Sequence, residues 1–167
     1  KTTLVKILAT VTKPSNGEVV VAGFDLKRNP SAIRRNIGLV THQPFLYPEL
    51  TARENLQFQG KMFTLTGLEE RIENIADRIG VHSFLERRVS ILSHGIQKRF
   101  SLARAILHDP PILLLDEPET GLDQEALDML GNVMSIGEKG RRTVLMTTHS
   151  LERGLALGNR VAILAGG

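Results

Sequence analysis

Two carboxylates follow directly on an apolar run in the segment ILLLDEP, residues 112–118. The run has no polar alternation, which is typical of a parallel strand that helices cover on both faces. Ligands of such sheets bind beyond the carboxyl ends of the strands, where Asp116 and Glu117 fall. Neighbouring side chains of an extended chain point in opposite directions, so we predict that one acid faces a metal ion and the other a water molecule or substrate. The competing interpretation is an apolar strand that simply leaves the core through acidic residues.

Three other segments bring polar groups to the same predicted edge. His149 follows the apolar run at residues 143–148, and Gln43 follows the β-rich run NIGLV. Lys1 and Thr2 begin a helical pattern, where a lysine and a hydroxyl suit terminal phosphates and their Mg²⁺. Alone, each of these residues is as readily an ordinary surface group, and KTT without preceding glycines is a weak signal. Together they predict a phosphate site in which a cation separates the anion from the carboxylates.

The elements that must position these groups alternate along the sequence. Strands are expected where β-rich runs lie between Gly, Pro or Asn, at residues 17–23, 36–40, 112–115, 143–148 and 160–164. Helices are expected from apolar spacings of three and four, at residues 1–12, 51–62, 67–79, 93–108, 124–138 and after 150. The pattern predicts one α/β domain with a mostly parallel sheet and a helical insert at about residues 51–108.

Local signals define the ends of the two short helices of this insert. Two pairs match the capping box, in which a hydroxyl and a glutamate satisfy each other's backbone amides: Thr51 with Glu54, and Thr66 with Glu69. Gly80 is predicted to end the second helix, because glycine readily adopts the left-handed conformation that closes a helix.

Composition excludes several classes of protein. The 167 residues, 41% of them apolar, suffice for one packed domain. A net charge of +3 with scattered basic pairs gives no reason to expect a nucleic-acid partner. The absence of cysteine excludes disulfides and thiolate metal sites. The apolar runs are far shorter than the roughly 18 residues of a membrane helix, so any membrane role must come through a partner.

The order of the motifs carries a family resemblance. Over essentially its whole length the sequence resembles the ATP-binding domain of ABC transporters, in the motifs KTT, THQP, LSHGIQKRFSLARAI, ILLLDEP, TGLD and TTHS. The resemblance implies a three-layer fold of the P-loop NTPase type, with ATP and Mg²⁺ as ligands and ATP hydrolysis as the activity. The family has a glycine-rich loop before the lysine. We therefore expect residues 1–167 to be a fragment that lacks the N-terminal strands with this loop, and also the C-terminal end.

The resemblance implies which residues bind the nucleotide and the metal. Lys1, Thr2 and Thr3 correspond to the end of the phosphate-binding loop, with Lys1 on the phosphates and Thr2 on Mg²⁺. Asp116 corresponds to the Walker B aspartate at the metal. Gln43 corresponds to the Q-loop glutamine, which is placed at the metal and in the catalytic centre.

The remaining catalytic roles also follow from the resemblance. Glu117 corresponds to the carboxylate that orients or deprotonates the attacking water, and His149 to the switch histidine near the γ-phosphate. Asp123 corresponds to the D-loop aspartate at the interface between two nucleotide-binding domains.

The signature segment LSHGI departs from the Leu-Ser-Gly-Gly-Gln of the family. Ser93 and Gly95 are retained, and they correspond to the hydroxyl and the backbone amide that grip the γ-phosphate of ATP on the opposite subunit. His94 replaces the first glycine and Ile96 the glutamine, which puts the strength of this grip in doubt. Either His94 compensates in part with its charge or it points to solvent, and we favour the second alternative.

Partners and location follow from the same resemblance. We expect a second ABC ATPase domain in a homodimer, and transmembrane permease subunits that hold the chain peripherally at the cytoplasmic face of the inner membrane. Phe45, Leu46 and Tyr47 are expected on the surface that contacts these subunits, unless they are ordinary core residues. Within transporters the sequence looks similar to bacterial heme exporters of cytochrome c maturation. The alternatives are a soluble non-transport ABC ATPase and a nucleotide-binding regulatory module without hydrolysis.

Overall fold

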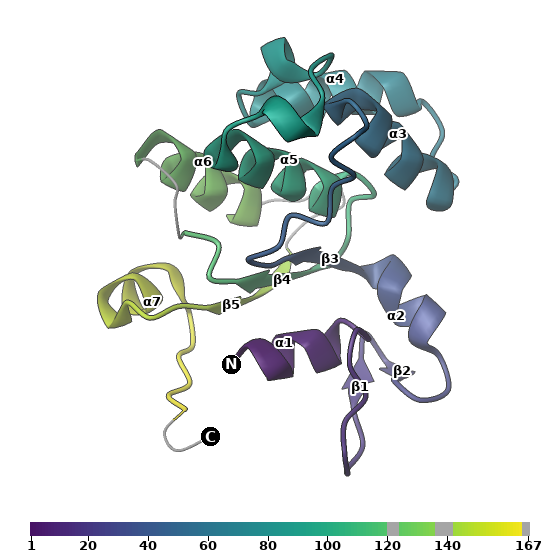
Figure 1. Cartoon of the computed structure of the whole chain (residues 1–167). Helices are drawn as coiled ribbons and strands as arrows, with labels where there is room; N and C mark the ends of the chain where they lie inside the picture. The colour runs from purple at the N-terminus through teal and green to yellow at the C-terminus, as the bar shows by residue number, and fades with distance from the viewer. Residues whose placement is uncertain (120–123, 136–141, 165–167) are drawn as a thin grey trace.

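A three-stranded parallel sheet forms the centre of the molecule (Figure 1). The computed structural model describes residues 1–119, 124–135 and 142–164. In sheet order the strands are β3 (Ile37–Val40), β4 (Ile112–Asp116) and β5 (Thr143–Thr147). The helices are α1 (Thr2–Leu8), α2 (Pro30–Asn36), α3 (Ala52–Met62), α4 (Leu68–Arg78), α5 (His94–Ile106), α6 (Gln124–Ser135) and α7 (Leu151–Leu157), with 3₁₀ turns η1 (His82–Phe84) and η2 (Val89–Ile91). The predicted α/β fold with a parallel sheet is confirmed.

Helices cover both faces of the sheet, as the unbroken apolar run of β4 predicts. Leu113 and Leu115 pack into a core with residues of α3, α4, α5 and α6, whereas Leu114 packs into a second core with residues of α1 and α2. Figure 1 shows these two groups of helices on opposite sides of the strands. A Cβ atom on Gly38 would collide with the backbone oxygen of Ala105, so this glycine lets β3 approach α5 closely.

The predicted strand at residues 17–23 is part of a small hairpin. Only β1 (Val20–Val21) pairs, antiparallel with β2 (Phe24–Asp25). Ala22 and Gly23 between them both have positive φ angles, of 53° and 80°, as a two-residue hairpin turn of type I′ requires. The tight turn explains why this strand pairs with the segment that follows it.

The helical region between β3 and β4 follows its predicted boundaries, with one exception at a helix start. The Thr51 and Glu54 capping box is present at α3, but the predicted box of Thr66 with Glu69 at α4 is wrong. Gly67 is the N-cap residue, in a left-handed conformation with a φ of 60°. The helix therefore begins one residue later than the box requires, and the Glu69 side chain binds α3 instead.

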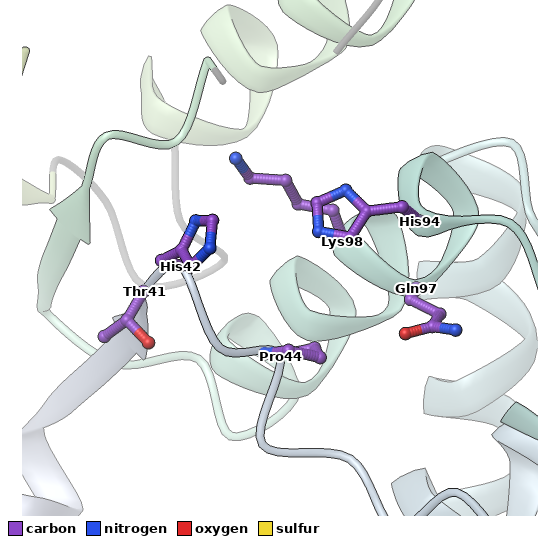
Figure 2. Close-up of a pocket in the computed structure, with 6 residues that line it drawn as sticks. All are labelled: Thr41, His42, Pro44, His94, Gln97 and Lys98. Carbon is purple, nitrogen blue, oxygen red and sulfur yellow. The ribbon is translucent and has the colours of Figure 1, made fainter. Parts of the chain in front are cut away.

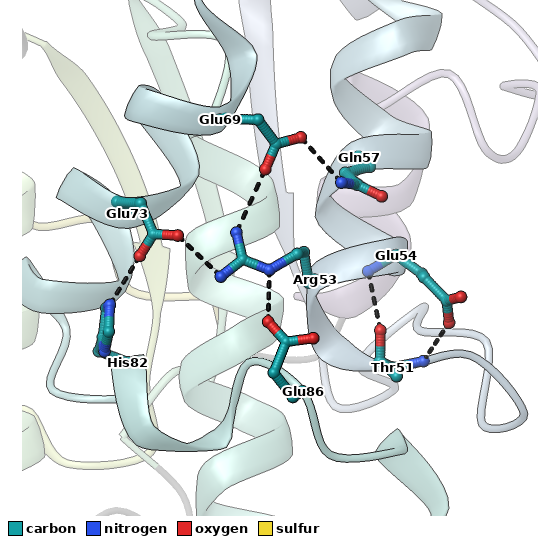
Figure 3. A network of polar contacts seen from close by, with 8 residues as sticks. All are labelled: Thr51, Arg53, Glu54, Gln57, Glu69, Glu73, His82 and Glu86. Carbon is teal, nitrogen blue, oxygen red and sulfur yellow. Dashed lines mark hydrogen bonds and ion pairs between the residues drawn. The ribbon is translucent and has the colours of Figure 1, made fainter.

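Arg53 is the centre of an ion-pair network that fixes α3 against α4 (Figure 3). Its guanidinium contacts Glu86 at 2.5 Å, Glu73 at 2.7 Å and Glu69 at 3.2 Å. Hydrogen bonds to Glu86 and Glu73 raise the pKa of Arg53, and the same guanidinium lowers the pKa of Glu73. His82 in η1 contacts the second oxygen of Glu73 at 2.6 Å. Since one cation joins three segments, the network orders this region more than isolated surface pairs would.

The first helix is shorter than predicted. The apolar spacing predicts a helix over residues 1–12, yet α1 ends at Leu8. Thr10 adopts a left-handed φ of 61°, and Val11 N–H donates to the carbonyl oxygen of Lys6, as in a Schellman motif. This stop signal is weak in the sequence because threonine replaces the usual glycine. In contrast, α4 closes as predicted at Gly80, which has a φ of 62°.

Two predictions near the C-terminal end have different outcomes. The strand predicted at residues 160–164 is wrong, because residues 161–164 form no strand and the side chains of Val161, Ile163 and Leu164 are exposed. Strand amides need a hydrogen-bonding neighbour, and none of the described strands pairs with residues 161–164. The helix predicted at 124–138 is present to Ser135, and its last positions lie outside the described residues.

His108 links the end of α5 to the start of β3. Its Nε2 atom lies 3.0 Å from the carbonyl oxygen of Ile37, and its ring stacks on Phe63 with centroids 4.0 Å apart. Burial lowers the pKa of His108 to about 4, helped by the nearby charges of Arg104 and Arg142. The imidazole is therefore neutral in the folded protein at pH 7.

Acid is expected to destabilise the fold through this histidine. Between pH 6.5 and 4 the unfolded chain binds a proton at this position and the folded chain does not. The free energy of unfolding therefore falls as the pH falls through this window, by at most about 3 kcal/mol. His108→Gln keeps an N–H donor but cannot titrate, so its unfolding midpoint in urea should fall less between pH 7 and 4.5. The exposed His42→Gln is the control, and an equal fall in His108→Gln and wild type would contradict this account.

Candidate functional site

The carboxyl ends of β4 and β5 meet at the centre of the site. Asp116 and Thr147 are directly paired in the parallel register, and Asp116 is only 4% exposed. The Thr147 hydroxyl donates a hydrogen bond to Asp116 Oδ1 at 2.6 Å. This bond holds the carboxylate at the strand end with one oxygen already engaged by the protein.

Glu117 turns away from the strand immediately after Asp116. Its φ of 50° lies in the left-handed region, which is unusual for glutamate. Its N–H donates to both the carbonyl oxygen and the hydroxyl of Thr147, each at 3.2 Å. Its carboxylate contacts His149 Nε2 at 2.5 Å, where His149 is 76% and Glu117 30% exposed. The two predicted catalytic side chains thus touch each other at the solvent side of the sheet edge.

Lys1 reaches the same edge from α1. Its Nζ atom donates to the carbonyl oxygen of Thr148 at 2.7 Å, next to His149 in sequence. Thr2 and Thr3 are exposed at the start of the helix. Within the described part of the chain, the hydrogen bond to the Asp116 carboxylate comes from Thr147 and not from Thr2. The structure therefore brings Lys1, Glu117 and His149 to one place and leaves the two threonines exposed.

Gln43 lies in the loop that leaves β3, the strand next to β4. Its side chain is exposed, and its backbone is fixed by Thr41, whose hydroxyl donates to the Gln43 carbonyl oxygen at 2.9 Å and accepts from its N–H at 3.2 Å. This turn presents the amide side chain outward at the carboxyl end of the sheet. Gln43 is thus an exposed donor and acceptor at the carboxyl edge of the sheet, the edge where Asp116 also lies.

The signature segment forms the start of α5. Ser93 is the N-cap residue, and its hydroxyl accepts from Ile96 N–H at 3.4 Å. Ser93 is exposed and Gly95 half-buried, so both remain open to a ligand that approaches the helix. His94 is exposed, with its ring centroid 6.3 Å from that of His42.

A small pocket joins the loop after β3 to α5 (Figure 2). Its lining residues are Thr41, His42, Pro44, His94, Gln97 and Lys98. In Figure 2 the rings of His42 and His94 and the Lys98 side chain lie around the same space. The lining carries no acid, and Lys98 is its one lysine.

Two residues of the site were not singled out from the sequence. Thr147 ends the strand beside Asp116, and its role could be found only from the strand register. Lys98 is 7% exposed, and its Nζ atom donates to the Glu117 carbonyl oxygen at 3.2 Å. The sequence pattern that could have indicated Lys98 is its helical spacing from two apolar residues. It lies four residues before Leu102 and seven before Ala105, on the buried face of α5.

The remaining polar groups of the site bear on whether it can hold a metal ion. Glu119 accepts a hydrogen bond from the Thr148 hydroxyl at 2.5 Å, while Asp123 lies outside the described residues. No group of three His, Asp or Glu suited to a metal occurs in the described ranges. The donors predicted for Mg²⁺ are instead the oxygens of Asp116, Thr2 and Gln43, and oxygen is the donor that Mg²⁺ prefers.

Comparison with known proteins identifies the family of this chain. A family profile described as ABC transporter matches residues 1–120, which include the sheet edge with Asp116 and Glu117. The chain belongs to the ABC transporter family. The relative NatA, an ABC transporter ATP-binding protein of Bacillus subtilis, is 34% identical over 170 residues, covering 100% of this chain and 69% of NatA. Nod factor export ATP-binding protein I of Rhizobium etli is 33% identical, and this chain spans 54% of its length.

Solved structures agree with this family. An ATP-binding subunit of an ABC transporter superposes with a TM-score of 0.84 at 27% identity, over 94% of this chain and 66% of that structure. A dimeric ATP-binding cassette, bound to ADP and Pi in a post-hydrolysis state, gives a TM-score of 0.77 at 28% identity, over 90% and 70% of the two chains. The fold of this chain is therefore that of the ABC ATPases.

The hydroxyl of Thr147 should contribute measurably to stability. Thr147→Val keeps the shape of the side chain but leaves the buried Asp116 carboxylate without this donor. We expect a loss of about 1–3 kcal/mol in the free energy of unfolding, measured by urea denaturation of the full-length protein. Thr143→Val, at the exposed start of the same strand, is the matched control. Equal stabilities of Thr147→Val and Thr143→Val would show that the hydroxyl is dispensable.

Proposed function

We propose that this chain binds Mg·ATP at the carboxyl edge of its sheet and hydrolyses it to drive a transporter. The observation that carries the proposal is the meeting of Lys1, Glu117 and His149 at the ends of β4 and β5. A phosphate chain at this edge would lie beside a cation, a carboxylate and an imidazole. These are the groups needed to bind a γ-phosphate and to activate a water molecule against it.

Each residue of the edge has a separate task in this proposal. Lys1 binds the terminal phosphates, and Asp116, Thr2 and Gln43 would hold Mg²⁺, which neutralises phosphate charge when bound. Glu117 orients the attacking water and accepts its proton. His149 contacts the Glu117 carboxylate and can donate a hydrogen bond toward the γ-phosphate. The buried position of Asp116 and the half-exposed position of Glu117 suit this division between metal and water.

A second copy of the chain completes the site in this proposal. Ser93 and Gly95 are accessible at the start of α5, where backbone amides favour an anion. They would bind the γ-phosphate of ATP held by the partner, with Asp123 and Thr3 also on the nucleotide side of the interface. The dimeric relative with ADP and Pi supports this arrangement. The exposed His94 would then lie beside the bound phosphate.

An aromatic surface near the β3 loop is the proposed contact with transmembrane permease subunits. Tyr47 and Phe58 pack edge to face with centroids 5.3 Å apart, and they are 53% and 45% exposed. Phe45 and Met62 are also exposed, at 45% and 65%, whereas Leu46 packs against the core. We name the contacting pair Tyr47 and Phe58 the aromatic surface. Exposed apolar groups gathered in this way mark binding surfaces.

Transport out of the cell is the proposed direction. The Nod factor relative is named for export, and a relative in Bacillus subtilis is a linearmycin resistance ATP-binding protein. No helix of the described residues is long and apolar enough to cross a membrane. A role in ATP-driven transport would place the chain at the cytoplasmic face of the membrane, held there by its permease. None of these relatives is named as a heme exporter, so heme export remains a prediction from the sequence resemblance alone.

The role of Glu117 is tested by Glu117→Gln in the full-length protein. The substitution keeps the size of the side chain but removes its ability to accept a proton. We expect turnover of ATP to fall by about 10² to 10⁴, with the Kd for ATP changed little. The exposed Glu18→Gln should match the wild type in both measurements. Unchanged hydrolysis by Glu117→Gln would refute the proposed role of this residue.

The aromatic surface is tested by co-purification from membranes. Tyr47→Ser with Phe58→Ser should lower the membrane-bound fraction of the tagged, full-length protein several-fold, because an apolar contact is lost. ATP hydrolysis by the isolated protein should not change. Phe24→Ser, on the distant β1–β2 hairpin, is the control, because it also replaces an exposed aromatic side chain with serine. If the double variant stays as membrane-bound as the control, the surface does not contact the permease.

A further inference from the structure

Lys98 is a buried lysine at the back of the candidate site. It lies on α5 at 7% exposure, and its Nζ atom donates to the Glu117 carbonyl oxygen at 3.2 Å. Lysine is rarely buried unless its charge is compensated. Burial lowers the pKa of Lys98, while the carboxylates of Glu119 and Glu117 act in the opposite direction. The fold therefore places a largely buried ammonium group beside the Glu117 carbonyl.

The carbonyl that Lys98 contacts belongs to a residue in a rare conformation. Glu117 has a left-handed φ of 50°, and such conformations persist only where surrounding contacts hold them. The N–H of Glu117 is held by Thr147 at the end of β5. Its C=O is held by Lys98 from α5. The peptide groups on both sides of the Glu117 Cα atom are thus fixed by two different elements.

The same helix carries the signature segment. Ser93 and Gly95 begin α5, and Lys98 follows Gly95 within one turn. A helix moves as a rigid unit over so short a distance, because its backbone bonds link each turn to the next. The Lys98 side chain therefore links the first turns of α5 to the Glu117 carbonyl.

We propose that Lys98 is a positioning residue that holds the Glu117 backbone and thereby orients the Glu117 carboxylate. The inference rests on the proposed hydrolysis of ATP. With the Glu117 backbone held at both peptide groups, its carboxylate keeps one direction over the edge of the sheet.

Lys98→Met in the full-length protein is the first test. Methionine keeps most of the length and volume of the side chain but donates no hydrogen bond. We expect kcat for ATP hydrolysis to fall about tenfold or more, while KM changes less than about twofold, because ATP binding does not use the Glu117 backbone. Lys98→Arg should restore much of kcat. If Lys98→Met does not fold, Lys98→Gln, whose amide is too short to reach the carbonyl, carries the same expectation.

Arg104 supplies a matched control on the same helix. Its Nη2 atom donates to the Leu39 carbonyl oxygen in β3 at 3.2 Å, so it is also a cation on α5 that binds a strand carbonyl. Arg104→Met should lower stability but leave kcat near the wild-type value. If Lys98→Met and Arg104→Met lower kcat equally, Lys98 serves only the packing of α5 and the proposal is overturned.

A double variant separates this inference from the proposed function. If Lys98 acts through Glu117, then Lys98→Met should cause no further loss of turnover when it is added to Glu117→Gln. Additive losses would overturn the positioning role. Full turnover of Glu117→Gln alone would instead refute the proposed function. Loss in Glu117→Gln with wild-type kcat in Lys98→Met would refute the positioning role and leave the proposed function intact.

Discussion

The parallel pairing of β4 with β3 on one side and β5 on the other determines where the polar groups of this protein can lie. In this register the strand ends meet at one edge, with Asp116 directly beside Thr147. The helices on both faces bury β4 and leave this edge open. Lys1 and Gln43 reach the edge from the elements that begin or end there. A change of one residue in register would turn the alternating side chains to the opposite faces and separate these groups.

The backbone turn at Glu117 gives two adjacent acids different surroundings. Asp116 remains in the strand and is buried, whereas Glu117 leaves it and reaches His149. A left-handed conformation costs a glutamate on the order of 1–3 kcal/mol. The Glu117 N–H donates to Thr147 and the Glu117 C=O accepts from Lys98, and these hydrogen bonds, each of about 1 kcal/mol, offset this cost. The geometry of the predicted catalytic carboxylate therefore depends on β5 and α5 as much as on its own strand.

Local patterns in the sequence predicted most of this arrangement, and the errors have physical causes. The apolar run of β4 and the capping box at Thr51 depend on near neighbours in sequence, so both could be predicted. The start of α4 and the end of α1 depend on left-handed conformations at Gly67 and Thr10, which the capping-box pattern and the apolar spacing do not reveal. The pairing of Lys98 with Glu117 joins distant segments and required the structure.

The most direct test of this account is a structure of the full-length protein with Mg²⁺ and a slowly hydrolysed ATP analogue. The account predicts that the γ-phosphate lies within hydrogen-bond distance of Lys1 Nζ, with Glu117 and His149 facing it and Ser93 of a second copy on its other side. A nucleotide bound away from the ends of β4 and β5 would contradict the account. A γ-phosphate at this edge with Glu117 turned away from it would contradict the proposed catalytic role.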